Sequence, residues 1–482
     1  MSHYRPPFRE AILAGLGVLG LYALTLAPST AMWDASEYIT TAHILGIPHP
    51  PGNPLFVVLG KSWSLLLSPT GLPVAVRINL LAAFTSAAAA AFYFLVAHRI
   101  LWGAFAGRSE KPSPIPMVGA VVALLISATA YTVWHQSTVN EKVYTVSVAV
   151  IAAVVWMTLR WRDLRDEPRG LRYLLGALYL LALGSTNHLM SVLPLPALGL
   201  FVLATAPGVL LKKELWVRAV PLVILGLSFN FFLPIRAAQN PIINEGDPTC
   251  ESVGGAVAAV YTNGKAGCEN LALVLSRHQY QKPPVTERQA PLGHQLLNYF
   301  QYFDWQWARG LDPAPQPMGG RLPVTVLFLI LGFWGLFLTW KADRGAFYLL
   351  GVLTLTLTIG LVFYLNFKYG YSLAPEIEES ARHEVRERDY FFIASFGVWG
   401  LLAGLGLVGL WQYLAESFRS PRRQLLAAPV LIVALLPLAS NWRWSSRAGD
   451  YATRDWAYNL LMSVEPYGVL FTNGDNDTFP LW

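Results

Sequence analysis

The sequence predicts an all-α protein that crosses a membrane many times, and three observations lead to this fold class. The 482 residues are 54% hydrophobic and only 13% charged, whereas soluble domains carry about 25% charged residues. Apolar runs of about 18 to 25 residues recur along the chain, and a helix of that length crosses roughly 30 Å of hydrocarbon. The cations, which give a net charge of +6, gather in short clusters between these runs. That pattern is typical of membrane topology and not of nucleic-acid binding.

We expect about eleven membrane-spanning helices, with boundaries loose by a few residues. They cover residues 10–27, 74–98, 115–134, 143–159, 172–186, 189–206, 219–235, 323–340, 346–365, 391–413 and 425–440. A cleaved signal peptide is the alternative for the first run, and we favour an uncleaved span because it tethers the polar segment that follows. The apolar run 54–67 is short and contains Lys61, so an interfacial or re-entrant helix is expected there.

Charge sets the expected orientation. With the N-terminus in the cytoplasm, every short basic loop falls on the inner side, as the positive-inside rule requires. The cations of these loops are Arg99, Arg108, Lys111, Arg160, Arg162, Arg165, Arg169, Lys212, Lys213, Lys341, Arg344, Arg419, Arg422 and Arg423. The outer side then receives residues 28–73, 135–142, 187–188, 236–322 and 366–390. Residues 1–440 are expected to form the transmembrane domain, and 441–482 the start of an outer region that continues beyond Trp482.

The first outer loop carries the most informative carboxylates. If residues 34–46 are helical, Asp34, Glu37 and Thr41 share one face. Asp34 would lie in the first turn, where the helix dipole favours an ionised carboxylate that can accept a proton. The alternative is that Asp34 only caps the helix and Glu37 is solvated. The following PHPPGNP is expected to form a stiff turn that holds His49 over a site, and a structural turn with an incidental histidine is the alternative.

Other outer segments place polar residues at the mouths of spans. Gln136 and Glu141 lie in WHQSTVNEKVY and His188 in TNH, positions from which side chains line aqueous cavities. Snorkelling or helix capping is the simpler interpretation of each one alone. Arg236 follows Pro234 at the outer end of a span, where it would bind a phosphate or anchor the helix to lipid headgroups.

The segment EIEESARHEVRERDYFF, residues 376–392, has the highest density of charge. If it is helical, Arg386 and Asp389 share a face, while Glu384 and Arg388 pair at a spacing of four. A self-neutralising surface helix explains the second pair. Guanidinium groups at a membrane boundary match a lipid phosphate in two-pronged geometry, which explains Arg386 better.

Three further features of the outer segments carry weaker signals. Trp305, in NYFQYFDWQW, offers an aromatic ring for stacking on a sugar or peptide, although interfacial aromatic belts need no ligand. Asp475 and Asp477 form a D-x-D pattern that lacks the rest of a calcium loop, so turn chemistry is expected and no metal site is predicted. Cys250 and Cys268 share one outer loop and are equally compatible with a disulfide and with free thiols.

Several motifs in order resemble a known family. They are WDASEY with PHPPGNP, NEKVY, LPIRAAQNP with GDP, HEVRERDYFF and LFTNGDNDTFPLW. This order is similar to the domain-of-unknown-function 2723 family, which includes transmembrane protein 260-like protein O-mannosyltransferases within the GT-C glycosyltransferases. The resemblance covers nearly the whole chain. Glu245 in INEGDP departs from the family pattern, in which an aromatic residue is expected, and this puts the role of that turn in doubt.

The resemblance implies a GT-C fold, a polyprenyl- or dolichyl-phosphate sugar donor and a protein or glycan acceptor, with no cofactor assigned and mannose as the expected sugar. Asp34 would act as the base of an inverting transfer, with Glu37 orienting the acceptor. Arg386, Arg388 and Arg236 would bind the donor phosphate. The pocket would be lined by His49, Glu141, Gln136, His188, Asp389 and Trp305.

Two other classes of function are compatible with parts of the sequence. A transporter or flippase of lipid-linked sugars should carry charges in the middle of its spans, and here nearly all lie at the outer ends. A non-catalytic membrane scaffold predicts that Asp34 and Glu37 can be replaced without consequence. The preference for Arg over Lys and the many Ala, Gly and Pro residues are typical of a bacterium of high genomic G+C, so the plasma membrane is the expected location.

Overall fold

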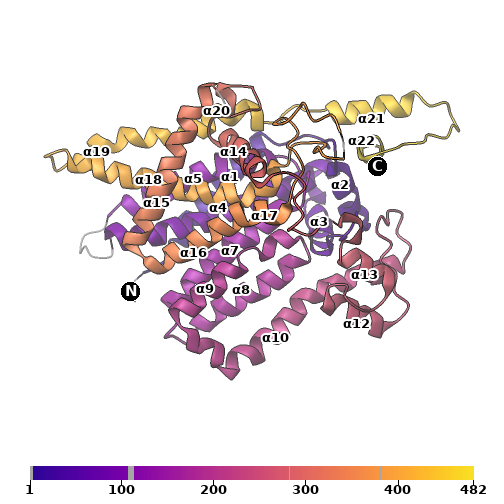
Figure 1. Cartoon of the computed structure of the whole chain (residues 1–482), viewed down its shortest axis with the longest axis horizontal. Helices are drawn as coiled ribbons and strands as arrows, with labels where there is room; N and C mark the ends of the chain where they lie inside the picture. Colours follow the sequence, from indigo (N-terminus) through magenta and orange to yellow (C-terminus); the bar gives the residue numbers. More distant parts are fainter. Residues whose placement is uncertain (1–3, 107–112, 282, 318, 380) are drawn as a thin grey trace.

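The computed structural model describes residues 4–106, 113–281, 283–317, 319–379 and 381–482. In these ranges the chain folds into α-helices with short 3-10 and π turns, and its β pairing is limited to two isolated bridges, Ile47 with Asn244 and Tyr369 with His383. The predicted all-α class is confirmed. Of the cations assigned to inner loops, Arg108 and Lys111 lie outside the described residues. Figure 1 shows a bundle of long helices with the chain's shorter helices and loops gathered toward one end.

Within the described residues, seven helical segments are long and apolar enough to cross a membrane. They are Val74–Phe105 (α4, Val74–Leu101, with its π turn), Tyr144–Asp163 (α7), Lys213–Ala237 (α10, Lys213–Leu227, through α11, Phe232–Ala237), Gly319–Ala342 (including α15, Leu322–Ala342), Arg344–Leu365 (α16, Arg344–Leu355, through α17, Leu361–Leu365), Asp389–Glu416 (including α18, Ile393–Glu416) and Arg423–Ser445 (α19, Arg423–Ala427, through α20, Leu436–Ser445). An eighth arises if α5 (Ile115–Thr129) and α6 (Tyr131–Ser137), which meet at an angle of 72°, are one span.

The remaining predicted spans are helical but shorter. They correspond to α1 (Phe8–Leu24), α8 (Gly170–Ser185) and the segment Leu189–Thr205, which includes α9 (Leu195–Thr205). All eleven predicted runs therefore coincide with helical segments of the described chain. Seven of these segments, or eight with the bent pair, are long and apolar enough to cross a membrane, so the count of eleven spans stays a prediction. The run expected to be interfacial is α3 (Pro54–Leu66), a helix of 13 residues.

Close helix crossings hold the bundle together, and small residues permit them. A Cβ atom at Gly406 of α18 would clash with the carbonyl oxygen of Leu331 in α15, and one at Gly335 would clash with that of Leu402. A Cβ at Gly404 would likewise clash with Ala123 in α5. Glycine lets two backbones approach closely, which is how helices gain van der Waals contact in a membrane. α18 is thereby buried among its neighbours, with 94% of its most apolar window inside the protein.

Charged residues at one end of the bundle form buried ion pairs. At the end assigned to the cytoplasm, Arg99 binds Asp163 at 2.7 Å and Arg162 binds Asp343 at 2.6 Å, and all four side chains are largely buried. These pairs join the ends of α4, α7 and the α15–α16 turn. Two of the cations assigned to inner loops, Arg99 and Arg162, therefore belong to a buried ion-pair network.

The other end holds the shorter elements: α2 (Ala35–Ile44), α3, α12 (Val253–Thr262), α13 (Glu269–Leu275), α14 (Leu292–Ala308), α21 (Ala452–Met462) and α22 (Asp475–Thr478). Cys250 and Cys268 form a disulfide across a separation of 18 residues, which decides between the two expectations in favour of the bond. α12 and α13 cover a small separate core around Leu233 and Leu271. The candidate site lies on this side, around the start of α2.

Candidate active site

α2 and the turn after it hold Glu37 and His49 in direct contact. Glu37 is fully buried, and its carboxylate accepts the backbone N–H of His49 at 2.6 Å and lies 2.6 Å from His49 Nδ1. Burial by itself lowers the pKa of His49, but the hydrogen bond and charge of Glu37 outweigh it and raise that pKa. The alternative of a solvated Glu37 is wrong. The PHPPGNP turn does hold His49 over the face of α2 that carries the acidic residues.

Asp34 occupies the N-cap position of α2, yet its side chain makes no capping hydrogen bond. Its carboxylate instead forms an ion pair with Lys142, and the two side chains are 14% and 10% exposed. The expectation that Asp34 and Glu37 point the same way is met only in part, because Glu37 turns inward to His49 while Asp34 meets a cation. The structure therefore places an ammonium group directly against the carboxylate of Asp34.

Glu141 and Arg386 form a second ion pair beside the first, joining segments 245 residues apart. The guanidinium of Arg386 also lies over two aromatic rings, 4.2 Å from the centre of Trp33 and 4.8 Å from that of Tyr390. Burial by itself raises the pKa of Glu141, but the positive charges of Arg386 and Lys142 lower it to about 2. The ammonium of Lys142 lies over the same Tyr390 ring at 5.3 Å, so the ring joins the two pairs into one cluster.

Arg388 lies next to this cluster, although not on the predicted helix. Its guanidinium binds Glu384 at 2.8 Å and the hydroxyl of Tyr390 at 2.8 Å. The predicted pairing of Glu384 with Arg388 is confirmed, but the helix on which it was considered does not form in the described residues of 376–392. The described residues of 376–392 form turns and irregular structure up to the 3-10 turn Asp389–Phe392, and His383 pairs with Tyr369 in an isolated parallel bridge.

Because that segment is not helical, Arg386 and Asp389 do not share a helix face. Asp389 turns toward α6 and accepts the hydroxyl of Thr132 at 2.5 Å. Arg386 and Arg388 reach different partners: Arg386 binds Glu141, and Arg388 binds Glu384.

The structure does not bring Arg236 to the cluster. Its guanidinium donates to the carbonyl of Leu45 at 2.6 Å and to that of Ile44 at 3.4 Å, which are the last carbonyls of α2. α2 has ten residues, so this end lies about 15 Å from the Asp34 end. In the structure Arg236 caps the C-terminus of α2, where a cation complements the helix dipole.

The other predicted pocket residues are divided between the cluster and its surroundings. The ring of His188 packs on Tyr144 at 4.8 Å, and burial holds the pKa of His188 well below its usual value. Gln136 is buried in α6. Trp305 is also buried and donates its indole N–H to the carbonyl of Pro315 at 2.8 Å, so its ring is part of the packing and is not free to stack on a ligand.

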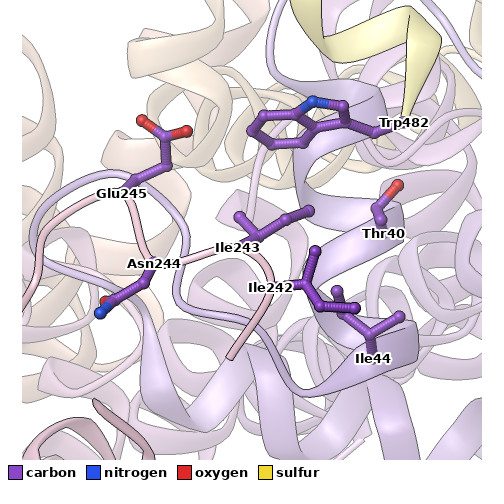
Figure 2. Close-up of a pocket in the computed structure, with 7 residues that line it drawn as sticks. All are labelled: Thr40, Ile44, Ile242, Ile243, Asn244, Glu245 and Trp482. Atoms are coloured by element: carbon purple, nitrogen blue, oxygen red, sulfur yellow. The ribbon is translucent and has the colours of Figure 1, made fainter. Parts of the chain in front are cut away.

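A cavity of about 620 Å³ adjoins α2. Figure 2 shows the indole of Trp482 lying across from Thr40, with isoleucine side chains facing the same space. It is lined by Thr40, Ile44, Ile242, Ile243, Asn244, Glu245 and Trp482. Glu245, the residue that departs from the family pattern, donates its backbone N–H to Ile47 and so pairs its turn with the segment that follows α2.

Sequence reasoning missed two members of the cluster. Lys142 and Trp33 are immediate neighbours of Glu141 and Asp34, inside motifs that had already been singled out. The available signal was the charge of Lys142 next to Glu141 and the aromatic residue preceding Asp34. Neither residue has a helical spacing to its partner, because the partners come from other segments.

Comparisons with known proteins agree with the motifs. Residues 34–209 match the model of the Protein O-mannosyl-transferase TMEM260 N-terminal domain, and residues 453–482 match TMEM260-associated domain 2. The predicted family resemblance is confirmed. Protein O-mannosyl-transferase TMEM260 of Mus musculus is 33% identical over 162 residues, which are 33% of this chain and 21% of that protein. Its Dictyostelium discoideum counterpart is 37% identical over 82 residues, 17% of this chain and 10% of that protein. The chain thus matches about a fifth or less of each relative.

The fold comparison extends over the whole chain. The crystal structure of ArnT from Cupriavidus metallidurans, bound to undecaprenyl phosphate, superposes with a TM-score of 0.53 and 12% identity. It covers 98% of this chain and 84% of that one. At this identity the likeness concerns the fold alone, and it confirms the predicted GT-C architecture of an integral membrane protein.

Proposed function

We propose that the chain is a membrane glycosyltransferase that moves a sugar from a polyprenyl- or dolichyl-phosphate donor to an acceptor hydroxyl, with inversion. One observation carries the proposal. A carboxylate, Asp34, and two cations, Lys142 and Arg386, meet around the ring of Tyr390 at one end of a GT-C bundle. A transfer from a lipid phosphate needs a base for the acceptor proton and positive charge for the leaving phosphate within a few ångströms of each other.

The reaction follows from these charges. The acceptor oxygen attacks the anomeric carbon, a new carbon–oxygen bond forms, and the bond from that carbon to the phosphate oxygen breaks. The bonding electrons leave with the lipid phosphate, and Asp34 takes the acceptor proton. Lys142, Arg386 and Arg388 stabilise the departing phosphate, since preorganised cations act most strongly where charge develops.

The neighbouring residues support these roles. Glu37, which is held by His49, would orient the acceptor beside Asp34, and Glu141 would hold Arg386 in place until a phosphate competes for it. Arg236, which binds the far end of α2, supports that helix and is not part of this phosphate clamp. The names of the relatives support mannose as the sugar and a protein hydroxyl as the acceptor.

Sugar transfer by the purified protein tests the proposal. Radiolabelled polyprenyl-phosphate mannose is supplied with a Ser/Thr-rich peptide mixture, and the wild type is compared with Asp34→Asn. Asp166→Asn is the matched control, because that carboxylate is 91% exposed at the other end of the bundle. Transfer by the wild type and the control, but not by Asp34→Asn, supports both the reaction and its base. Full activity of Asp34→Asn removes Asp34 from that role, and saturable donor binding without any transfer favours a carrier.

We also propose that the cluster faces the extracytoplasmic side of a bacterial plasma membrane, with the N-terminus in the cytoplasm. The inner position of the short basic loops and the Arg-, Ala- and Pro-rich composition support this. Single cysteines placed at exposed positions in a variant without the disulfide test the orientation. A membrane-impermeant maleimide applied to intact cells should label Glu251→Cys and not Asp166→Cys, and the reverse labelling contradicts the orientation.

A further inference from the structure

The last described segment of the chain reaches the first outer loop. The side-chain oxygen of Asn476, in α22, accepts the backbone N–H of Trp33 at 2.6 Å across a separation of 443 residues. In Figure 1 the labels of α22 and α2 lie at the same end of the molecule, and the 3-10 turn after α22 packs on α2. Trp33 immediately precedes Asp34, so this contact is made one residue from the proposed base.

Trp33 has a backbone that needs such a contact. Its φ is 65°, in the left-handed region that a bulky residue rarely adopts unless its surroundings hold it there. The turn has a consequence for the site, because it presents the indole to the guanidinium of Arg386 at 4.2 Å. The conformation of Trp33 therefore determines the position of the indole ring against which the Arg386 guanidinium packs.

Asn476 is itself held by its own turn. Asp477 accepts the backbone N–H of Asn473 at 2.9 Å, and the hydroxyl of Thr478 donates to that of Thr472 at 2.7 Å. This confirms the turn chemistry expected for the D-x-D pattern. These bonds close the backbone turn from which the Asn476 side chain reaches Trp33.

We propose that Asn476 is a positioning residue for the donor-phosphate site. By holding the N–H of Trp33 it fixes the left-handed turn, and the turn places Arg386 against the indole and Asp34 against Lys142. The inference rests on the proposed transferase function. In this role Asn476 does not contact the substrate. It acts through the backbone of Trp33, in the first outer loop.

Substitutions at Asn476 separate positioning from packing. Asn476→Leu keeps the size of the side chain but removes the accepting oxygen, whereas Asn476→Asp keeps that oxygen. Asn459→Leu, at an exposed position of α21, is the matched control. We expect kcat/KM for the polyprenyl-phosphate donor to fall by about tenfold or more in Asn476→Leu, because misplacement by about 1 Å costs up to roughly a hundredfold in rate. Asn476→Asp and Asn459→Leu should stay near the wild type.

A second background shows whether the effect passes through Trp33. Glycine adopts a positive φ without strain, so Trp33→Gly no longer needs the contact and has also lost the indole. Trp33→Gly alone should lower kcat/KM, and adding Asn476→Leu should lower it no further. Independent, multiplying losses in the double variant would overturn the proposal. So would wild-type kinetics of Asn476→Leu, or equal losses in Asn476→Leu and Asn476→Asp.

Binding of undecaprenyl phosphate alone is measured in parallel on the same variants. Weaker binding by Asn476→Leu, with Asn476→Asp near the wild type, supports the positioning role, and equal binding by all three overturns it. This measurement does not depend on transfer. A wild type that binds the lipid phosphate but transfers no sugar contradicts the proposed function, and the role of Asn476 is still decided by the binding data.

Discussion

The ion pair between Glu141 and Arg386 makes a quantitative prediction about stability. The pKa of Glu141 falls from its ordinary value of 4.5 to about 2, because the charges of Arg386 and Lys142 outweigh burial. At about 1.36 kcal/mol per pKa unit, this corresponds to roughly 3 kcal/mol of stabilisation of the ionised carboxylate. Glu141→Gln should therefore be less stable than the wild type by about that amount at pH 7.

The pH dependence follows from the sign of the shift. A group whose pKa is lowered by folding contributes its full stabilisation above its unfolded value, here 4.5, and loses it as the pH falls from there through about 2. The difference between the wild type and Glu141→Gln should fall to less than about half at pH 3. Guanidinium unfolding in detergent micelles, followed by tryptophan fluorescence at pH 7, 5, 4 and 3, measures it.

An exposed pair provides the control. Glu214 lies 3.0 Å from Arg218, both side chains are 56% exposed, and such surface pairs contribute about 0 to 1 kcal/mol. Glu214→Gln should change little at any pH. Equal stability of Glu141→Gln and the wild type at pH 7, or a difference that stays constant down to pH 3, would refute the reasoning.

Three further outcomes are expected. Because Glu37 raises the pKa of His49 above 6.5, the stabilisation from this pair should be complete below pH 6.5 and disappear as the pH rises through the folded pKa. A His49→Gln variant whose loss in free energy of unfolding is independent of pH contradicts this. Replacing Cys250 and Cys268 by serine should cost about 3 kcal/mol, the chain-entropy value for a loop of about 15 residues, seen as a lower melting temperature that dithiothreitol reproduces in the wild type. Gly406→Val should prevent folding of the bundle because its Cβ meets a carbonyl oxygen of α15, and a monodisperse, wild-type-like chromatographic peak would contradict that crossing.

The local pattern of the chain was enough to find its elements. Every predicted span coincides with a helical segment, because an apolar run in lipid must satisfy its own backbone hydrogen bonds and a helix does so within the run. The contact of Glu37 with His49 was also within reach, since both lie in one motif and a stiff proline turn joins them. The charge spacing over 376–392 was enough to pair Glu384 with Arg388 but not to place Arg386, because spacing fixes which residues can pair in a helix and not whether the helix forms.

The partners of the charged residues were decided only by the tertiary structure. Asp34 meets Lys142 across 108 residues and Glu141 meets Arg386 across 245, and no local spacing specifies such pairs. Arg236 is a second example. Its position at the outer end of a span is compatible with binding a phosphate and with binding the end of a helix, and in the folded protein it binds the C-terminal end of α2. The sequence by itself singled out Asp34, Glu141 and Arg386 as candidates, but not Lys142 or Trp33, and it gave the side of the membrane on which they are expected. The folded bundle determined which of them meet, since contacts between distant segments depend on how the helices cross.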